Sequence, residues 1–83
     1  MNPVIEKEVF PLVGKVKWEG FDINSFGSLM SLKCKFIKHT QQGNTDKLKK
    51  YLAFCIQTWP EGVNDCPVDR DILDAAIAVI KNQ

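Results

Sequence analysis

The sequence has few of the residues from which metal sites and disulfide frameworks are built. Its 83 residues include one histidine, His39, and three cysteines, Cys34, Cys55 and Cys66. An odd number of cysteines without a C-x-x-C pair argues against a disulfide framework, and a lone histidine completes no zinc ligand set. The acidic residues near the C-terminus do not follow the spacing of a calcium-binding loop. We therefore expect no metal site.

Long apolar runs are also missing. The longest, Ala75 to Ile80, has six residues, whereas a membrane-spanning helix needs about 20. The first ten residues, MNPVIEKEVF, carry two acidic side chains and no long apolar run, unlike a secretory signal. Free cysteines on apolar faces suit a reducing compartment. These features predict a cytoplasmic protein without membrane contact.

The sequence offers little for catalysis or cofactor binding. Its five glycines are scattered singly and form no glycine-rich phosphate-binding turn. A nucleophilic pair of Cys66 and His39 would need contact between them and a third group to orient the imidazole. The simpler interpretation is that Cys66 lies in a loop and His39 at the solvated end of an element. We expect no cofactor, no catalytic residue and no enzymatic activity.

What the chain does contain is typical of one small globular domain. Apolar residues make up 45% and charged residues 25%, and we treat 1–83 as a single domain. From Leu12 to Trp18, apolar and lysine side chains alternate, which predicts a half-buried strand. Glu19 and Gly20 follow as a turn signal, which would make this strand the first half of a hairpin.

The last forty residues carry two amphipathic helical patterns. The first predicts a helix over 45–59, capped by Asn44 or Thr45. The second predicts a helix over 69–82, capped by Asp69. The loop between them is short enough for the two helices to pack as an antiparallel pair.

Residues 22–38 fit two structures. A helix is favoured by Asp22 as its N-cap, with Phe21 packing on Phe26 as a hydrophobic staple. A strand over 29–37 is favoured by alternating apolar residues, although it leaves a long loop before it. The expected fold is α+β and mainly helical, with a short N-terminal β-strand or hairpin followed by two or three helices.

Charge is distributed unevenly along the chain. The net charge is −1 over residues 1–32, +5 over 33–50 and −3 over 51–83. We predict that the lysines of the middle segment form a partner-binding surface, the basic band. These lysines are Lys33, Lys35, Lys38, Lys47, Lys49 and Lys50.

A second, weaker set of partner-binding residues is apolar and acidic. Phe54 lies off the main apolar stripe of its helix, and Asp71 and Asp74 belong to the last helix. With the basic band, this set predicts a non-enzymatic module that binds another protein, as an adaptor, inhibitor or assembly factor. Self-association is a second option. The size and the lack of motifs are common among accessory proteins of phages and mobile elements.

The alternative function is a small nucleic-acid-binding regulator that uses the lysines of 33–50 on phosphates. The residue types favour it less. Base reading prefers arginine, and Arg70, the one arginine, lies outside the band. Tyr51 is the one aromatic residue near the band for base stacking.

Overall fold

Helices provide all the regular structure in residues 3–61 and 65–83, which are the residues that the computed structural model describes. Two short turns, η1 (Ile5–Val9) and η2 (Phe10–Leu12), precede three longer helices. These are α1 (Phe26–Gln42), α2 (Thr45–Thr58) and α3 (Arg70–Lys81). No strand occurs among the described residues, so the predicted α+β class is wrong and the fold is all helical.

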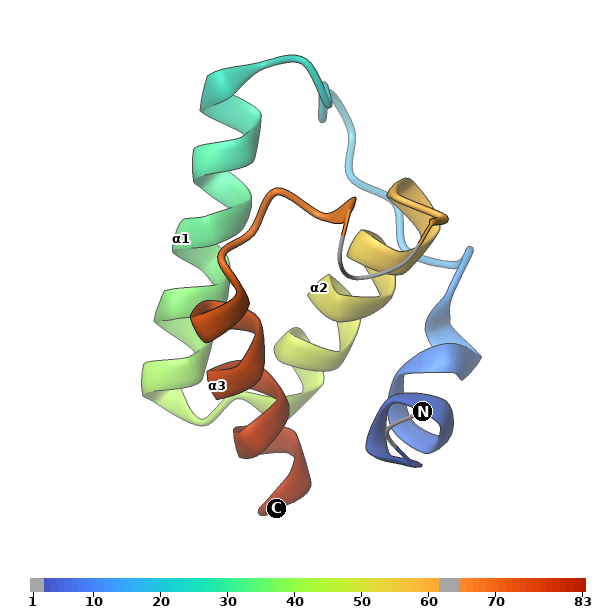
Figure 1. The fold of residues 1–83 in the computed structure, drawn as a ribbon, viewed down its shortest axis with the longest axis vertical. Coiled ribbons are helices and arrows are strands. Elements are labelled where there is room, and N and C mark those ends of the chain that lie inside the picture. Colours follow the sequence, from blue (N-terminus) through green and yellow to red (C-terminus); the bar gives the residue numbers. More distant parts are fainter. Residues whose placement is uncertain (1–2, 62–64) are drawn as a thin grey trace.

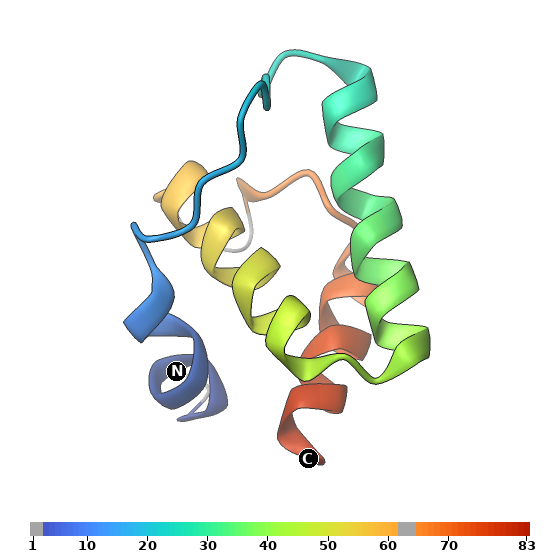
Figure 2. The same cartoon turned by 180° about the vertical axis from the view of Figure 1, so that it is seen from behind.

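Helix α2 is the central element of the fold. It packs against α1 and α3 on one side and against η1 and η2 on the other. In Figures 1 and 2, α2 lies between α1 and the two N-terminal turns. The largest side chains that are almost completely buried come from all three long helices and from η1. They are Phe36, Leu32, Leu48, Leu52, Leu73, Ile80 and Val9.

Helix α1 covers most of residues 22–38, the segment that fitted either a helix or a strand, but it is shifted toward the C-terminus. Ser25 is its N-cap, and the Ser25 Oγ accepts a hydrogen bond from the Ser28 N–H at 3.2 Å. The predicted cap, Asp22, instead accepts a hydrogen bond from the Asn24 N–H at 2.8 Å. The helix ends at Gly43, whose φ of 64° places it in the left-handed region that favours glycine. The strand predicted over 29–37 is therefore absent.

Helices α2 and α3 occupy the regions in which the periodicity predicts them. The Asn44 side chain caps α2 by accepting a hydrogen bond from the Lys47 N–H at 3.3 Å. Asp69 stands at the N-cap of α3, but its side chain makes no capping hydrogen bond and lies 3.8 Å from the Lys33 ammonium. Of the loop predicted between the two helices, residues 62–64 lie outside the described residues.

The predicted strand from Leu12 to Trp18 is wrong, because within residues 3–61 and 65–83 no second strand pairs with it. The Gln57 side chain on α2 takes the place of that strand. Its Oε1 accepts hydrogen bonds from the Gly14 N–H at 2.8 Å and from the Val16 N–H at 3.4 Å, and its Nε2 donates to the Val16 carbonyl at 2.6 Å. One amide side chain thus satisfies backbone groups that a sheet would otherwise pair.

The turn predicted at Glu19 and Gly20 is present, but it does not lead into a second strand. The Phe21 N–H donates to the Trp18 carbonyl at 3.3 Å, and Gly20 has a φ of 77°. Beyond the turn, Phe21 packs on Phe54 of α2 with ring centroids 4.8 Å apart, so it does not form the predicted staple with Phe26. We call residues 13–24 the arm, because they cross from η2 to α1 along α2 (Figure 2).

Among the residues that the structure describes, no helix has both the length and the apolar content that a bilayer crossing requires.

Candidate functional site

The structure distributes the six lysines of the basic band over three places. Lys33 faces α3, where its ammonium lies 3.8 Å from the Asp69 carboxylate. The basic band is therefore not one continuous surface, and its first lysine is partly neutralised by an acid from the C-terminal third of the chain.

A second group of these lysines surrounds His39 at the corner between α1 and α2. Burial is the largest cause of the lowered pKa of His39. The positive charges of Lys38, Lys47 and Lys35 lower this pKa further. The Lys35 ammonium lies 5.6 Å from the centre of the Trp18 ring, in position for a cation–π contact. Lys38 and Lys47 are exposed.

The third place is a groove of about 380 Å³ between the arm and α2, which we call the lysine groove. Its lining combines four lysines with two apolar residues and one acid. The lining residues are Leu12, Lys15, Val16, Lys17, Asp46, Lys49 and Lys50.

The arm positions the two lysines that sequence reasoning did not include. Gln57 holds the backbone at Gly14 and Val16, and Val16 is buried while Lys15 and Lys17 on either side of it are exposed. The period-two pattern therefore identifies the correct faces of this segment even though no strand forms. That pattern was the signal for Lys15 and Lys17, because it placed them together on the solvent side.

The electrostatics of the lysine groove favour an anion. Four lysines and one aspartate give its lining a net charge of +3. The Lys49 ammonium lies 3.2 Å from the Glu8 carboxylate, so η1 partly compensates this lysine and holds it in place. Lys15, Lys17 and Lys50 are exposed and have no acidic side chain within ion-pair distance in the described part of the chain.

The weaker set of predicted site residues is divided between core and surface. Phe54 is 5% exposed and packs on Trp18 and Phe21, with ring centroids 5.2 and 4.8 Å away. It lies off the main stripe because the arm covers that side of α2. Asp71 and Asp74 are exposed on α3, and Asp74 accepts a hydrogen bond from the Arg70 Nε at 3.1 Å.

The residues considered for catalysis have separate neighbours. Cys66 is buried against Cys55, and the hydrogen bond between the two thiols, together with burial, raises the pKa of Cys55. The same hydrogen bond lowers the pKa of Cys66. His39 stacks on Tyr51 with ring centroids 5.7 Å apart. Within residues 3–61 and 65–83, no three histidine, cysteine or acidic side chains come together as metal ligands.

The geometry of the lysine groove suits a chain that is both acidic and apolar. Lysine ammonium groups on flexible stems reach carboxylates or phosphates at the rim, while Leu12 and Val16 offer an apolar floor. Comparisons of the chain with protein-family models, with curated proteins and with solved structures find no match in any of the three.

Proposed function

We propose that this protein is a non-enzymatic binding module that holds an acidic segment of another protein in the lysine groove. The observation that carries the proposal is the convergence of four lysines from two elements over an apolar floor. Carboxylates of the partner would reach the exposed ammonium groups, and an apolar side chain between them would contact Leu12 and Val16. Charge attraction speeds such an encounter, and apolar contact slows release.

A protein partner is favoured over nucleic acid by what surrounds the lysines. Trp18, the nearest aromatic side chain of the arm, packs against Tyr51 and Phe54 and lies under Lys35, so it is not free to stack on a base. The lining contains no arginine, the residue type that favours forked contacts with phosphates and bases.

The test measures binding of a labelled peptide in which glutamates alternate with leucines, by fluorescence anisotropy. The groove variant reverses three exposed charges, as Lys15→Glu, Lys17→Glu and Lys50→Glu. We expect saturable binding to the unaltered protein, weakened about tenfold or more in the variant, which corresponds to ~1.4 kcal/mol or more. Binding should also weaken with added salt, because the lysines are exposed.

A matched control variant makes the same change in net charge elsewhere, as Lys38→Glu, Lys47→Glu and Lys81→Glu. These three lysines are exposed and do not line the groove. Equal loss of binding in both variants would show a general charge effect and would contradict the proposal. An all-glutamate peptide should bind more weakly than the mixed one, because it lacks apolar contacts with the floor.

Single-stranded and duplex DNA of similar charge are measured in the same assay. Tighter binding of DNA than of the mixed peptide, lost in the groove variant, would replace the proposal with the nucleic-acid alternative. A triple variant with glutamine at positions 15, 17 and 50 removes the three positive charges without adding negative ones. It controls for loss of binding that is caused by charge repulsion and unfolding in the glutamate variant. Its circular dichroism should match that of the unaltered protein, and its peptide binding should be reduced.

A further inference from the structure

Helix α1 carries apolar side chains on a face that the other described elements leave partly open. Phe26, Met30 and Ile37 are 78%, 38% and 43% exposed. Their spacing of four and seven residues places them along one side of the helix, which we call the α1 stripe. The buried residues of α1, Leu32 and Phe36, lie on a different side. The stripe is therefore additional to the core face of the helix.

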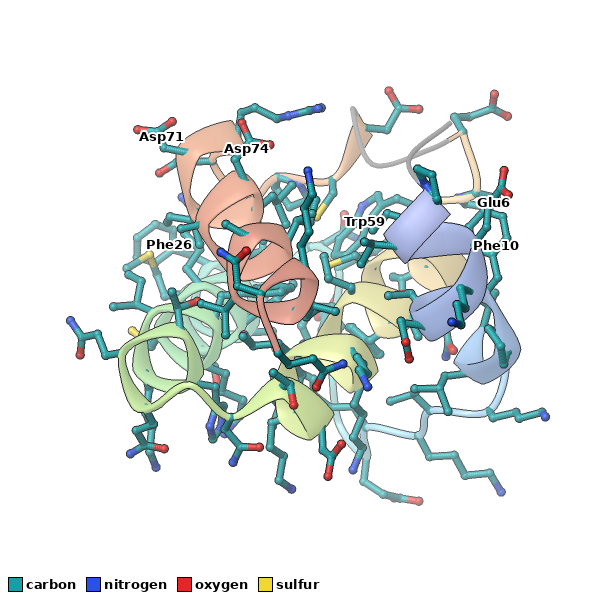
Figure 3. The ribbon with its side chains drawn as sticks, turned by 90° about the horizontal axis from the view of Figure 1, so that it is seen from below. Glu6, Phe10, Phe26, Trp59, Asp71 and Asp74 are labelled. Carbon is teal, nitrogen blue, oxygen red and sulfur yellow. The ribbon has the colours of Figure 1, made fainter. Side chains whose placement is uncertain are left out.

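At its C-terminal end the α1 stripe opens into a groove of about 260 Å³ between α1 and α3, which we call the α1–α3 groove. Three of its six lining residues are apolar, and one, Asp71, is acidic. The lining residues are Ile37, Thr40, Gln41, Asp71, Ile72 and Ala75. Figure 3 shows Phe26 and Asp71 on the same side of the molecule, opposite Phe10 and Glu6.

The two ends of this face complement each other but cannot meet within one molecule. Phe26, the most exposed of the large apolar side chains, projects from the first turn of α1, and Ile37 of the groove lies eleven residues later. At 1.5 Å per residue, about 16 Å of rigid helix separates them. A second copy of the chain removes this obstacle. A twofold axis perpendicular to α1 near residues 32–33 places Phe26 of each copy over the groove of the other.

We propose that this protein forms a weak symmetric dimer in which Phe26 of each copy occupies the α1–α3 groove of the other. The proposal is separate from peptide binding, since none of these residues lines the lysine groove.

The charges at the two ends are also complementary. Phe26 is the first residue of α1, and the first turn of α1 contains no acidic residue. Docking Phe26 in the groove brings that helix end to Asp71 of the other copy, where a carboxylate is favourable. Asp71 has no ion pair with another described residue. A twofold dimer makes this contact twice.

The like charges nearest the proposed axis are partly compensated within each copy. Lys33, the lysine nearest that axis, lies 3.8 Å from the Asp69 carboxylate of its own copy. Lys35 lies on the far side of α1, with its ammonium over the Trp18 ring. The area supports a weak contact, because an aromatic side chain buries only about 150–250 Å² and a stable interface needs about 800 Å² from each partner. We therefore expect dissociation in the micromolar range or above.

Sedimentation velocity across a concentration series, from micromolar to submillimolar, tests the proposal. The unaltered protein should shift from monomer to dimer as its concentration rises. Phe26→Ala should remain monomeric, whereas the control Phe10→Ala should dimerise normally. Phe10 is 40% exposed and lies on the opposite side of the molecule.

The groove side has its own matched pair of variants. Ala75→Glu places a charge in the groove and should abolish the dimer, whereas Ala78→Glu, on an exposed position of the same helix outside the lining, should not. Asp71→Asn should weaken dimerisation about two- to fivefold. Asp74→Asn should leave it unchanged, because Asp74 faces Arg70.

Chemical cross-linking reports the orientation of the two copies. Cys34 is exposed and lies within one helical turn of the proposed axis, while Cys55 and Cys66 are buried. A short bismaleimide should link two copies through Cys34, and Phe26→Ala and Cys34→Ser should each prevent this. A monomeric mass at every concentration, or a dimer unaffected by both Phe26→Ala and Ala75→Glu, would overturn the proposal. Each of these monomeric variants should still bind the acidic peptide, so the two proposals fail separately.

Discussion

At the scale of single residues, His39 is the buried titratable side chain with the clearest consequence for stability. It is 7% exposed and stacks on Tyr51. Its Nδ1 has no hydrogen-bond partner in the described part of the chain. Burial and then the charges of Lys38 and Lys47 lower the pKa of His39 below its ordinary value of 6.5. The folded protein therefore favours the neutral imidazole.

This shift predicts a loss of stability in mild acid. The unfolded chain takes up a proton at His39 near pH 6.5, whereas the folded chain takes it up only at lower pH. The free energy of unfolding should therefore fall as the pH drops below about 6.5. Urea unfolding between pH 7.5 and about 5.5 measures the fall, since carboxylates titrate mainly below that range. In His39→Phe, which keeps a ring against Tyr51, the free energy of unfolding should depend less on pH. The same pH dependence in both proteins would show that His39 is not the group responsible.

At the scale of elements, the start of α1 is held by a small hydrogen-bond network. The Ser25 Oγ accepts from the Ser28 N–H at 3.2 Å, and the Ser28 Oγ accepts from the Asp22 N–H at 3.2 Å. Two serines thus connect the last turn of the arm to the first turn of the helix. This network also fixes the position of Phe26, the residue that follows the cap.

Removing the side chain of Ser25, the observed N-cap, should lower stability more than removing that of Asp22, the N-cap that the sequence suggested. Ser25→Ala should lower the free energy of unfolding by about 1 kcal/mol, the usual loss for an N-cap. Asp22→Ala should cost less than half of this, because Asp22 is exposed and, among the residues that the structure describes, its carboxylate bonds only the Asn24 N–H. Urea unfolding at pH 7.5 compares the two variants. An equal or larger loss of unfolding free energy in Asp22→Ala would contradict the assignment of Ser25 as the N-cap.

The sequence predicts these elements best where a pattern has one physical interpretation. The repeats of α2 and α3 extend over three turns or more and have clear caps, so their positions follow from periodicity. Around α1, Asp22 and Ser25 are both good caps, and spacing alone does not choose between them. The alternation from Leu12 to Trp18 predicts the buried and exposed faces correctly. It cannot reveal that Gln57, some forty residues later, bonds the backbone in place of a strand.

At the scale of the whole molecule, the arm is held by α2 through two kinds of contact. Gln57 binds the backbone at Gly14 and Val16, and Trp18 packs on Phe54 at 5.2 Å. The lysine groove exists only while the arm is docked, because three of its lining residues come from the arm. This is also why the sequence did not predict the groove: Lys15 and Lys50 are far apart in the chain, and only the fold brings them together.

Loss of the Gln57 amide should therefore loosen the arm and weaken the groove. Gln57→Leu should lower the free energy of unfolding by about 1–2 kcal/mol, since the bonds lie near the surface. Hydrogen exchange should become faster at the Gly14 and Val16 amides, and binding of the acidic peptide should weaken. Gln57→Glu keeps the acceptor for the two N–H groups but places a carboxylate oxygen against the Val16 carbonyl oxygen, so this variant should also loosen the arm. Unchanged exchange at both amides in Gln57→Leu would show that the aromatic contacts alone hold the arm.

The long reach of Gln57 also bears on how the chain folds during its synthesis. Val16 and Trp18 are translated some forty residues before the glutamine that fixes the arm. At about 5–20 residues per second on the ribosome, the arm waits for seconds before α2 is available. During that interval the α2 surface, on which its apolar side chains finally pack, is missing. Lys15 and Lys17 alternate with Val16. We expect these charged side chains to keep the early segment hydrated until it docks.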